Sequence, residues 1–485
     1  MGSVLSPSEL NSLVDDLAAI VGRDHVLDGE AARKAYTGDM SWLSLAAAAS
    51  GQPLSRQQVV VSLANTDEVA AVVRVANARR VPITPVGGAS GVQGAANADR
   101  GGITLNLRRL DRVLAIDDQS LICLVEAGVL VQKLEQHLNE RGFTFTHFPA
   151  SAEWATVGGA LAARGSGVLS SKYGKIEDHV LSIELVTPTG DIVRTPSVPR
   201  HAAGPDLTQL LIGSEGTLGI ITAVIIKIRK QPAIRLFSTY AFGSLKEGIE
   251  AGRQIMTSNL RPAVMRLYDE DAASHSLSKA VDAPLRTATL ILVADGDHKD
   301  VAEAEHRVMR QICVDCGAYE LGEALAARWW DRRYVFYYPP HAPELPSIWC
   351  TIDVVTDYAH IEEVYARVTA AIRAACDPKW DLQLVTHLSH WYDWGTMIYA
   401  RFKIPRGPAS FDEALALHDG IVREGTRAAL AAGAVLNDHH GVGMRLGAYM
   451  PEQFGAAGMD MLTRIKRGLD PRNILCPGKL GLPAD

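Results

Sequence analysis

The sequence has no long hydrophobic run. A membrane-spanning helix needs about 20 mostly apolar residues, and the alanine tract Ala46–Ala49 is far shorter. The N-terminus also lacks a basic region followed by an apolar stretch, which argues against a secretory signal. We therefore expect no transmembrane segment and a cytoplasmic location. Residues Met1–Ser6 fit an acylation pattern, which leaves peripheral membrane contact open.

A basic excess and paired cysteines are missing as well. The formal net charge is -7, whereas nucleic-acid binders normally carry a positive balance, so we expect no nucleic-acid partner. The six cysteines are scattered, as in proteins of a reducing compartment. Cys313 and Cys316 form a CxxC without a second pair. Two half-buried thiols are the simpler interpretation, and a redox or metal role is the alternative.

What the sequence does contain is enough apolar material for two or three domains: 485 residues, 47% of them hydrophobic. In the first 230 residues, short apolar runs alternate with helical patterns and glycines gather at turns, which is α/β organisation. The predicted strands are Val59–Leu63, Ile83–Val86, Gly102–Leu107, Val113–Ile116, Leu121–Glu126, Val180–Thr187 and Ile220–Ile228. The predicted helices are Thr66–Arg79 and Leu130–Arg141.

The pattern changes at Lys230-Gln231-Pro232, after which strand–helix–strand units follow. The predicted strands there are Ile234–Phe242, Ala263–Leu267, Thr287–Val293, Ser347–Val354, Leu382–Leu388 and Thr396–Phe402. The predicted helices are Leu245–Met256, Val301–Cys316, Ile361–Ala375 and a final Pro451–Leu469. A sheet with helices on one face is a plausible substrate domain.

Three glycine-rich segments have the composition needed to bind a phosphate or a flat ring. PVGGASGVQGA, Pro85–Ala95, follows a predicted strand and could present several backbone N–H groups to a phosphate, although it matches neither GxGxxG nor a Walker loop. In Ser151–Gly167, the ATVGG sequence opens a helical pattern, so that a helix N-terminus could meet an anion. Leu211–Thr222 places glycines just before a strand, where backbone can run along a planar ring. Each segment alone is a weak signal.

Together, in this order and spacing, the three segments resemble the PCMH-type FAD-binding domain of the vanillyl-alcohol oxidase superfamily. The resemblance implies FAD as cofactor. It implies that the following residues bind it: Pro85, Gly87, Gly88, Ala89, Ser90, Gly91, Ser151, Thr156, Gly158, Gly159, Glu215, Gly216 and Ile220. Many relatives attach FAD covalently to a histidine of the first loop. Ala89 and Ser90 stand there in this sequence, so we predict non-covalent FAD.

The resemblance narrows to the alkyldihydroxyacetonephosphate synthase family. It runs through KYGKIEDHVLSIELVTPTG from Lys172, the segment from Pro199 to Pro232, VMRLYD (Val264–Asp269), YDWGTMIY (Tyr392–Tyr399) and DHHGVG (Asp438–Gly443). That family joins a fatty alcohol to a ketone phosphate through a flavin N5 adduct, without net redox. Members are commonly dimers, so the resemblance also implies a homodimer.

The family's active-site residues carry over onto a few positions. Its arginine matches Arg266, its tyrosine matches Tyr399, and its run of three histidines reads Asp438-His439-His440 here. An arginine associated with substrate phosphate aligns with YVFYYPPH, where Pro340 or a neighbour takes its place. Both departures weaken the expectation of ether-bond chemistry, and the second weakens that of a phosphorylated substrate.

The matched residue types suit proton and oxygen chemistry. Neutral imidazoles at His439 and His440 can accept a hydroxyl proton, although a turn with exposed histidines is the alternative. Tyr399 could share that task, or be a half-buried strand tyrosine. Arg266 suits a substrate carboxylate or oxygen, or else an ion pair with Asp269.

A metal site is the alternative for several of these histidines. In this superfamily, some D-2-hydroxy-acid dehydrogenases hold a divalent metal with histidines, which would here be His387, His390 and His440. Their HxGDGNxH pattern is absent. We therefore predict no metal.

The expected fold class is α+β: a two-subdomain PCMH-type FAD-binding domain over residues 1–230 and an α/β cap domain over residues 231–450. Residues 451–485 would return to the FAD domain. The leading functional hypothesis is an FAD-dependent oxidoreductase that oxidises a small hydroxylated substrate by hydride transfer, with Tyr399, His439, His440 and Arg266 as catalytic residues. Non-redox ether-bond formation is the alternative, and a flavin-binding protein with a decayed site is the third.

Overall fold

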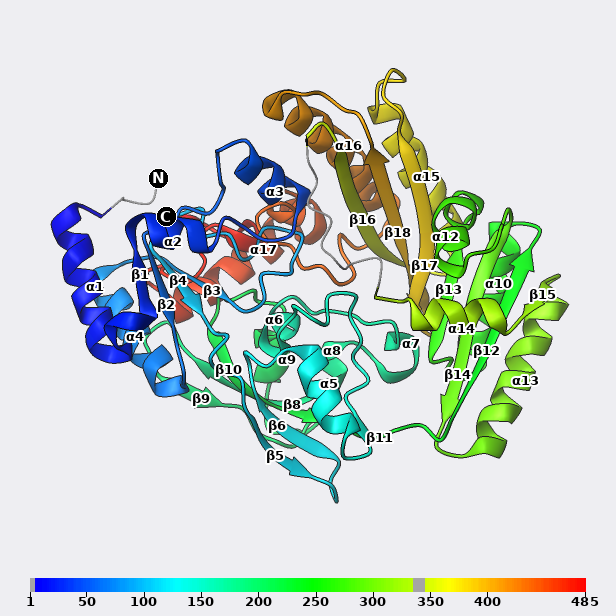
Figure 1. Cartoon of the computed structure of the whole chain (residues 1–485), viewed down its shortest axis with the longest axis horizontal. Helices are drawn as coiled ribbons and strands as arrows, with labels where there is room; N and C mark the ends of the chain where they lie inside the picture. The colour runs from blue at the N-terminus through cyan, green and yellow to red at the C-terminus, as the bar shows by residue number, and fades with distance from the viewer. Residues whose placement is uncertain (1–4, 335–344) are drawn as a thin grey trace.

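The computed structural model describes residues 5–334 and 345–485. Pro340 with most of YVFYYPPH, and Met1–Val4 of the acylation pattern, lie outside the described residues. Within the described ranges, no helix combines the length and apolarity that crossing a membrane requires. Figure 1 shows two sheets at one end of the molecule and a third, larger sheet at the other.

The first sheet has four strands in the order β1-β2-β4-β3, of which β2, β4 and β3 are parallel. Apolar side chains of the strands and of two covering helices form one core. The chain's C-terminal segment runs along the outer strand, where Ile83 donates to the Ile474 carbonyl and accepts from the Cys476 amide. The elements are α1 (Pro7–Val21), β1 (Val26–Asp28), α2 (Gly29–Ala35), β2 (Val59–Ser62), α4 (Thr66–Arg79), β3 (Ile83–Val86) and β4 (Ile103–Asn106).

The second sheet is antiparallel, with the order β5-β6-β10-β8-β9. Its apolar face packs on α5 and α6 in a separate core. Strands β7 and β11 form a small ribbon beside it. The elements are β5 (Val113–Asp117), β6 (Ile122–Glu126), α5 (Val131–Asn139), β7 (Phe143–Thr144), α6 (Val157–Ala162), α7 (Ser170–Tyr173), α8 (Ile176–His179), β8 (Val180–Val186), β9 (Ile192–Arg194), α9 (Leu207–Leu211), β10 (Ile220–Lys227) and β11 (Arg229–Lys230).

The third sheet has seven strands in the order β15-β12-β14-β13-β17-β18-β16. Helices α10, α13, α15 and α16 cover one face and build the largest core; part of the other face is left to line a cavity. Its elements are β12 (Ile234–Phe242), α10 (Leu245–Thr257), β13 (Val264–Tyr268), α11 (Glu270–Ala272), α12 (Ser278–Val281), β14 (Ala288–Gly296), α13 (Lys299–Asp315), β15 (Tyr319–Gly322), α14 (Ala324–Asp331), β16 (Ile348–Asp357), α15 (Ile361–Ala375), β17 (Gln383–Trp391), β18 (Gly395–Ile404) and α16 (Phe411–Ala431). Helix α17 (Met450–Leu469) follows.

One early helix packs against this third sheet. α3 (Trp42–Ala49) lies beside β16 and α16 (Figure 1). The Trp42 indole donates to the Ser347 carbonyl at 2.9 Å and stacks on His418 at 4.6 Å between ring centroids. Ala46 and Ala47 are fully buried there, which gives a packing role to part of a tract that the sequence alone left without one.

The expected fold class is confirmed. The predicted strands and helices are present with ends shifted by a few residues at most. The elements that the sequence did not predict include α1, α3 and the long α16.

Candidate functional site

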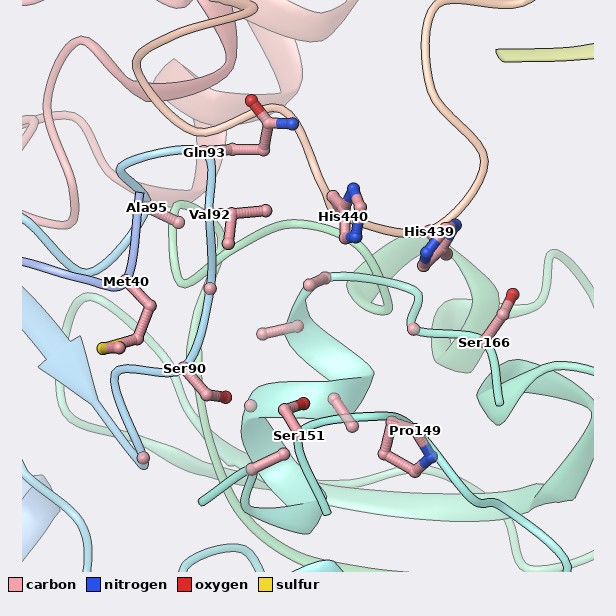
Figure 2. A pocket seen from close by; sticks show the side chains of 18 of the residues that line it. Met40, Ser90, Val92, Gln93, Ala95, Pro149, Ser151, Ser166, His439 and His440 are labelled. Atoms are coloured by element: carbon pink, nitrogen blue, oxygen red, sulfur yellow. The ribbon is translucent and has the colours of Figure 1, made fainter. Parts of the chain in front are cut away.

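A cavity of about 960 Å³ lies between the two smaller sheets and the seven-stranded sheet. All residues predicted for the site line it: Pro85, Gly87, Gly88, Ala89, Ser90, Gly91, Ser151, Thr156, Gly158, Gly159, Glu215, Gly216, Ile220, Arg266, Tyr399, His439 and His440. Figure 2 shows Ser90, Ser151 and the two histidines around this space. Segments far apart in the sequence therefore meet at one place.

The loop after β3 offers backbone donors to the cavity. In the described residues, the amides of Gly87, Gly88, Ala89 and Gly91 donate no hydrogen bond. Ala89 has a φ of 51°, a left-handed conformation that a non-glycine residue rarely adopts and that often marks a functional loop. A Cβ added at Gly88 would lie 1.6 Å from the Trp154 carbonyl oxygen, so this close approach requires glycine. Free amides in a tight glycine loop suit a phosphate.

The first backbone amides of α6 have partners within the protein. Gly158 donates to the Ala127 carbonyl, Val157 to the Val129 carbonyl, and Gly159 to the Thr156 hydroxyl that caps the helix. The preceding strand segment and the cap therefore already satisfy these amides, and the anion contact expected of this helix start stays a prediction. A Cβ at Gly158 would lie 2.6 Å from the Ala127 side chain, so the glycine serves close packing of helix on sheet.

Glu215 joins the second sheet's loop to the histidine loop. It has a φ of 48° and a buried side chain. Its carboxylate accepts from the amides of Val442 and Gly443 at 2.6 and 2.7 Å. Burial raises the pKa of Glu215 to about 7 against the lowering effect of these two amides. The sequence placed Glu215 along the cofactor; the structure shows that it also fixes the backbone after the histidines.

The opposite wall is one face of the seven-stranded sheet. Strand register places His387 beside Tyr399 and Asp353 across from Tyr399, and alternate residues of a strand share a face. The Arg266 guanidinium lies 2.6 Å from His387 Nε2. Since a guanidinium only donates, Nε2 accepts and His387 is neutral. Burial and then the Arg266 charge lower the pKa of His387 well below its ordinary value, in agreement with this assignment.

Arg266 has no ion pair with Asp269. The Asp269 carboxylate instead accepts from the amides of Ala272 and Thr386 and from the Tyr365 hydroxyl. Arg266 Nε is buried without a partner in the described residues. A half-buried guanidinium that faces a cavity and has no ion pair within the described residues is suited to an anionic or oxygen ligand.

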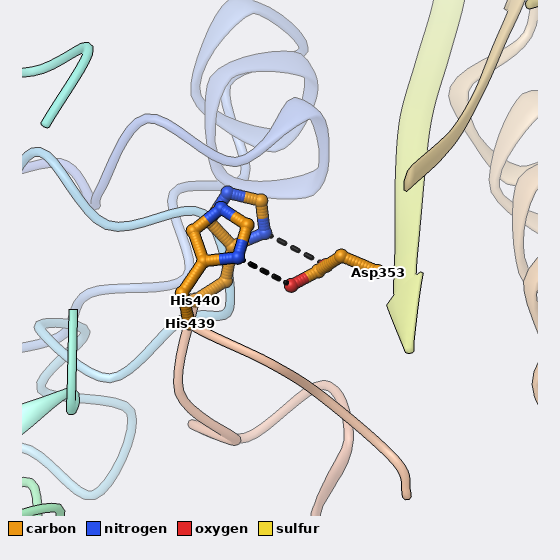
Figure 3. A group of neighbouring side chains, drawn as sticks. All are labelled: Asp353, His439 and His440. Atoms are coloured by element: carbon orange, nitrogen blue, oxygen red, sulfur yellow. Dashed lines mark hydrogen bonds and ion pairs between the residues drawn. The ribbon is translucent and has the colours of Figure 1, made fainter. Parts of the chain in front are cut away.

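The two adjacent histidines converge on one buried carboxylate, Asp353 of β16 (Figure 3). His440 Nδ1 lies 2.8 Å from Asp353 Oδ1, and His439 Nδ1 lies 3.4 Å from Oδ2. Burial opposes the charge of Asp353, but His440 and then His439 outweigh it and lower its pKa. A carboxylate at Nδ1 holds the proton there and leaves Nε2 as the acceptor.

Burial and then His440 lower the pKa of His439 to about 4. His439 is therefore neutral at neutral pH, and its nitrogen is only weakly basic. Burial and then Asp353 raise the pKa of Tyr399 to about 12, which keeps its hydroxyl protonated. Tyr399 stacks on His387 with 4.6 Å between the ring centroids.

Asp438 connects the histidine loop to β17. Its Oδ2 lies 2.8 Å from His390 Nδ1 and 3.1 Å from His439 Nδ1, and its Oδ1 accepts from the Tyr392 hydroxyl. Lys175 contacts its backbone carbonyl and lies 3.9 Å from Oδ1. Burial opposes its charge, yet Lys175 and then His390 lower the pKa of Asp438 well below its ordinary value. Asp438 is therefore charged, and it links the histidine loop to His390 and Tyr392.

The histidine trio considered for a metal does not converge, because His387 is bonded to Arg266 instead. Within the described ranges, two other clusters bring possible ligand atoms within 4.8 Å of one another: Asp353 with His439 and His440, and Asp438 with His390 and His439. The CxxC is part of neither cluster: Cys313 is buried in α13, and Cys316, just beyond its end, is partly buried.

Sequence reading missed Asp353, and it assigned no partner to His387 or Asp438. Asp353 has hydrophobic residues on both sides in its strand, and a buried charge there needs a partner. This pattern could have indicated a functional carboxylate. The partner lies about 87 residues away along the chain, which no local pattern indicates.

The cavity, with its glycine loops on one side and the face of the seven-stranded sheet on the other, defines an FAD-dependent enzyme. The FAD binding domain family matches residues 57–196, and the family of FAD linked oxidases, C-terminal domain, matches residues 231–480. The chain belongs to the FAD-linked oxidase family, and FAD is its cofactor.

Three similar proteins span most of the chain. It is 27% identical to alkyldihydroxyacetonephosphate synthase of Trypanosoma brucei brucei, over 96% of this chain and 80% of that protein. It is 29% identical to a mitochondrial D-lactate dehydrogenase (cytochrome) of Arabidopsis thaliana, over 87% of this chain and 73% of that one. The solved structure of p-cresol methylhydroxylase with substrate bound has a TM-score of 0.79 at 17% identity, covering 99% and 98%, which shows the shared fold.

Proposed function

We propose that the protein is an FAD-dependent oxidoreductase that oxidises the CH–OH group of a small hydroxylated substrate. The observation that carries this is the Asp353–His440 hydrogen bond of 2.8 Å at the wall of the FAD cavity. A histidine oriented by a buried carboxylate is a general-base arrangement. The mitochondrial D-lactate dehydrogenase among its relatives supports a hydroxylated substrate.

In this proposal, His440 accepts the hydroxyl proton. Its Nδ1 is occupied by Asp353, so Nε2 holds the free lone pair. Asp353 then stabilises the imidazolium that forms, because its carboxylate is already hydrogen-bonded to Nδ1 of that ring. His439, whose pKa is lowered to about 4, is a weak base, and its ring packs against that of His440 with 4.0 Å between the centroids.

Arg266 and Tyr399 hold the substrate. The Arg266 fork binds a carboxylate or oxygen beside the reacting carbon, and its bond to His387 fixes its direction. Tyr399, with its pKa raised to about 12, donates a hydrogen bond to a substrate oxygen. When bound, FAD supplies the hydride acceptor for the C–H bond that breaks.

FAD binding is assigned to the three glycine segments, with the free amides of Gly87, Gly88, Ala89 and Gly91 at the phosphates. Ala89 and Ser90 provide no covalent attachment, so denaturation should release the colour from the protein. Residues 1–230 with 451–485 would form the FAD domain and residues 231–450 the cap. The pairing of Ile83 with the C-terminal segment supports this division.

The test is an anaerobic titration of the holoenzyme with D-2-hydroxy acids, aromatic alcohols and a ketone phosphate ester. Loss of the oxidised-flavin absorbance with a hydroxylated compound is the expected result, and readmitted air then separates oxidase from dehydrogenase. If no hydroxylated compound reduces the flavin in a broad screen, the proposal fails.

A second candidate is non-redox ether-bond formation, favoured by the similarity to alkyldihydroxyacetonephosphate synthase. Asp438 in place of a histidine speaks against it, because a carboxylate bound to Tyr392 and His390 cannot act as that base. Detection of an alkyl product from an acyl-ketone phosphate and a fatty alcohol would reverse the ranking.

A further inference from the structure

Strand β18 carries a row of functional side chains along the cavity. Tyr399, Arg401 and Lys403 alternate along the strand and all line the cavity. Same-face neighbours on a strand are about 7 Å apart. The row therefore leads from the catalytic tyrosine to a cation about 7 Å away and a second one roughly 13 Å away.

The residues across from this row belong to β16. Register places Thr351 opposite Arg401 and Trp349 opposite Lys403, and both line the cavity. Of the cavity-lining residues, Glu215 is the one acid, and both of its oxygens accept from loop amides. This end of the cavity thus has two cations and no carboxylate to neutralise them.

The two charges are also unmatched elsewhere. Arg401 makes one side-chain hydrogen bond, of 3.1 Å to the Ser276 hydroxyl. In the ranges that the structure describes, Lys403 makes no side-chain hydrogen bond, and neither residue has an ion pair. Two other arginines of this part of the chain are paired, Arg310 with Glu320 and Arg373 with Asp271. Adjacent unpaired cations repel each other, and they create a positive field that draws anions into a cavity.

The field reaches the reacting centre. Arg401 is among the charges that lower the pKa of His387 and of Tyr399, in both cases after burial as the largest influence. An anion held at Arg401 would therefore be felt by the residues that contact the substrate's oxygen.

We propose that Arg401 and Lys403 form a subsite for a second anionic group of the substrate, a carboxylate or a phosphate, distal to the reacting carbon. The inference rests on the proposed function for the reacting end, where Arg266 binds the first group. The substrate class is then a hydroxy acid with an anion at its far end, rather than a simple monocarboxylate or an aromatic alcohol.

The test measures dissociation constants of unreactive product analogues on the holoenzyme by calorimetry. The probes are 2-oxoglutarate, its homologues lengthened by one to four methylenes, the monocarboxylate of matching length for each, and a 2-oxo acid ending in a phosphate ester. The expected result is binding at least about tenfold tighter for the dianion at a favoured length greater than that of 2-oxoglutarate, since one charge-assisted bond is worth that factor. The phosphate arm shows which oxyanion is preferred.

Variants assign the preference to the two residues. Arg401→Gln and Lys403→Gln should each remove most of the dianion preference, so that the dianion and the monoanion of matching length bind with similar dissociation constants. Arg307→Gln, which removes one exposed charge from α13, should leave both unchanged.

Equal binding of dianions and monoanions at every length overturns the inference, as does a preference that survives the double variant. Absence of binding by every probe overturns it too. Dianion binding that depends on Arg401, in an enzyme whose flavin no hydroxy compound reduces, would support the subsite and refute the proposed reaction.

Discussion

Replacing Asp353 with asparagine tests the assignment of the base. Asp353→Asn keeps the size of the side chain and removes the charge that contacts His440 at 2.8 Å and His439 at 3.4 Å. The amide can present its N–H to Nδ1 and so favour the wrong tautomer, with the proton on Nε2. A hydrogen bond to a charged group is worth about 1.5–3 kcal/mol, and about 1.4 kcal/mol is a factor of ten in rate. Flavin reduction should therefore slow about 10- to 100-fold.

The assay is anaerobic stopped-flow reduction at saturating substrate, so that binding effects are removed. Asp357→Asn is a matched control: Asp357 ends the same strand and contacts His360 Nδ1 at 2.8 Å, but both residues of this pair are exposed. It should reduce at the wild-type rate. Melting temperature and bound FAD establish that each variant is folded.

A cycle with His440→Asn completes the test. If the two residues act as one unit, the double variant should be no slower than His440→Asn alone. A wild-type reduction rate in folded Asp353→Asn, or fully additive losses in the cycle, would refute the dyad.

Three further predictions follow from the geometry. Gly88→Ala should lose bound FAD, because the added Cβ would lie 1.6 Å from the Trp154 carbonyl oxygen. Gly420→Ala in α16, where the added Cβ meets nothing within 4 Å, is the control. The flavin-to-protein absorbance ratio measures FAD occupancy in both variants, and full occupancy in Gly88→Ala would contradict the loop's role. Arg266→Gln should lower kcat/KM about 10- to 100-fold, since it removes a charged contact, and steady-state kinetics that leave kcat/KM unchanged would place the substrate elsewhere. His439 has its pKa lowered to about 4, so the folded state resists its protonation: stability is fully present above about 6.5 and declines as pH falls toward 4. His439→Asn should flatten that decline in melting temperature, and an unchanged pH dependence would show that another group causes it.

The ends of most elements could be predicted from the sequence because local signals specify them. Helix α4 begins after Asn65, whose side chain caps the Glu68 amide, and the glycine loop follows β3 directly. Helix α16 was missed although it is the longest. Its glycines resemble breaks, yet Gly425 is there because a Cβ would lie 2.5 Å from Ile352, a contact visible only in the packed structure.

For the candidate site too, local patterns could be predicted from the sequence and contacts between distant segments could not. The loops that line the cavity carry recognisable residue patterns and could be predicted as a group. The partnerships could not: Arg266 with His387, Asp438 with His390, and Asp353 with both histidines depend on strand register. The bond that occupies the Gly158 amide is a further case, because the Ala127 carbonyl that accepts it comes from a separate strand segment.

The C-terminal segment has a consequence for biosynthesis. Lys479 bonds the Gly94 carbonyl of the first loop from 385 residues away, and the chain beside β3 comes from residues near 475. Ribosomes add residues in order, at about 5–20 per second. The strand that carries the phosphate loop therefore waits on the order of a minute for its neighbour, and the nascent chain should acquire its cofactor only after the residues near 475 have been added.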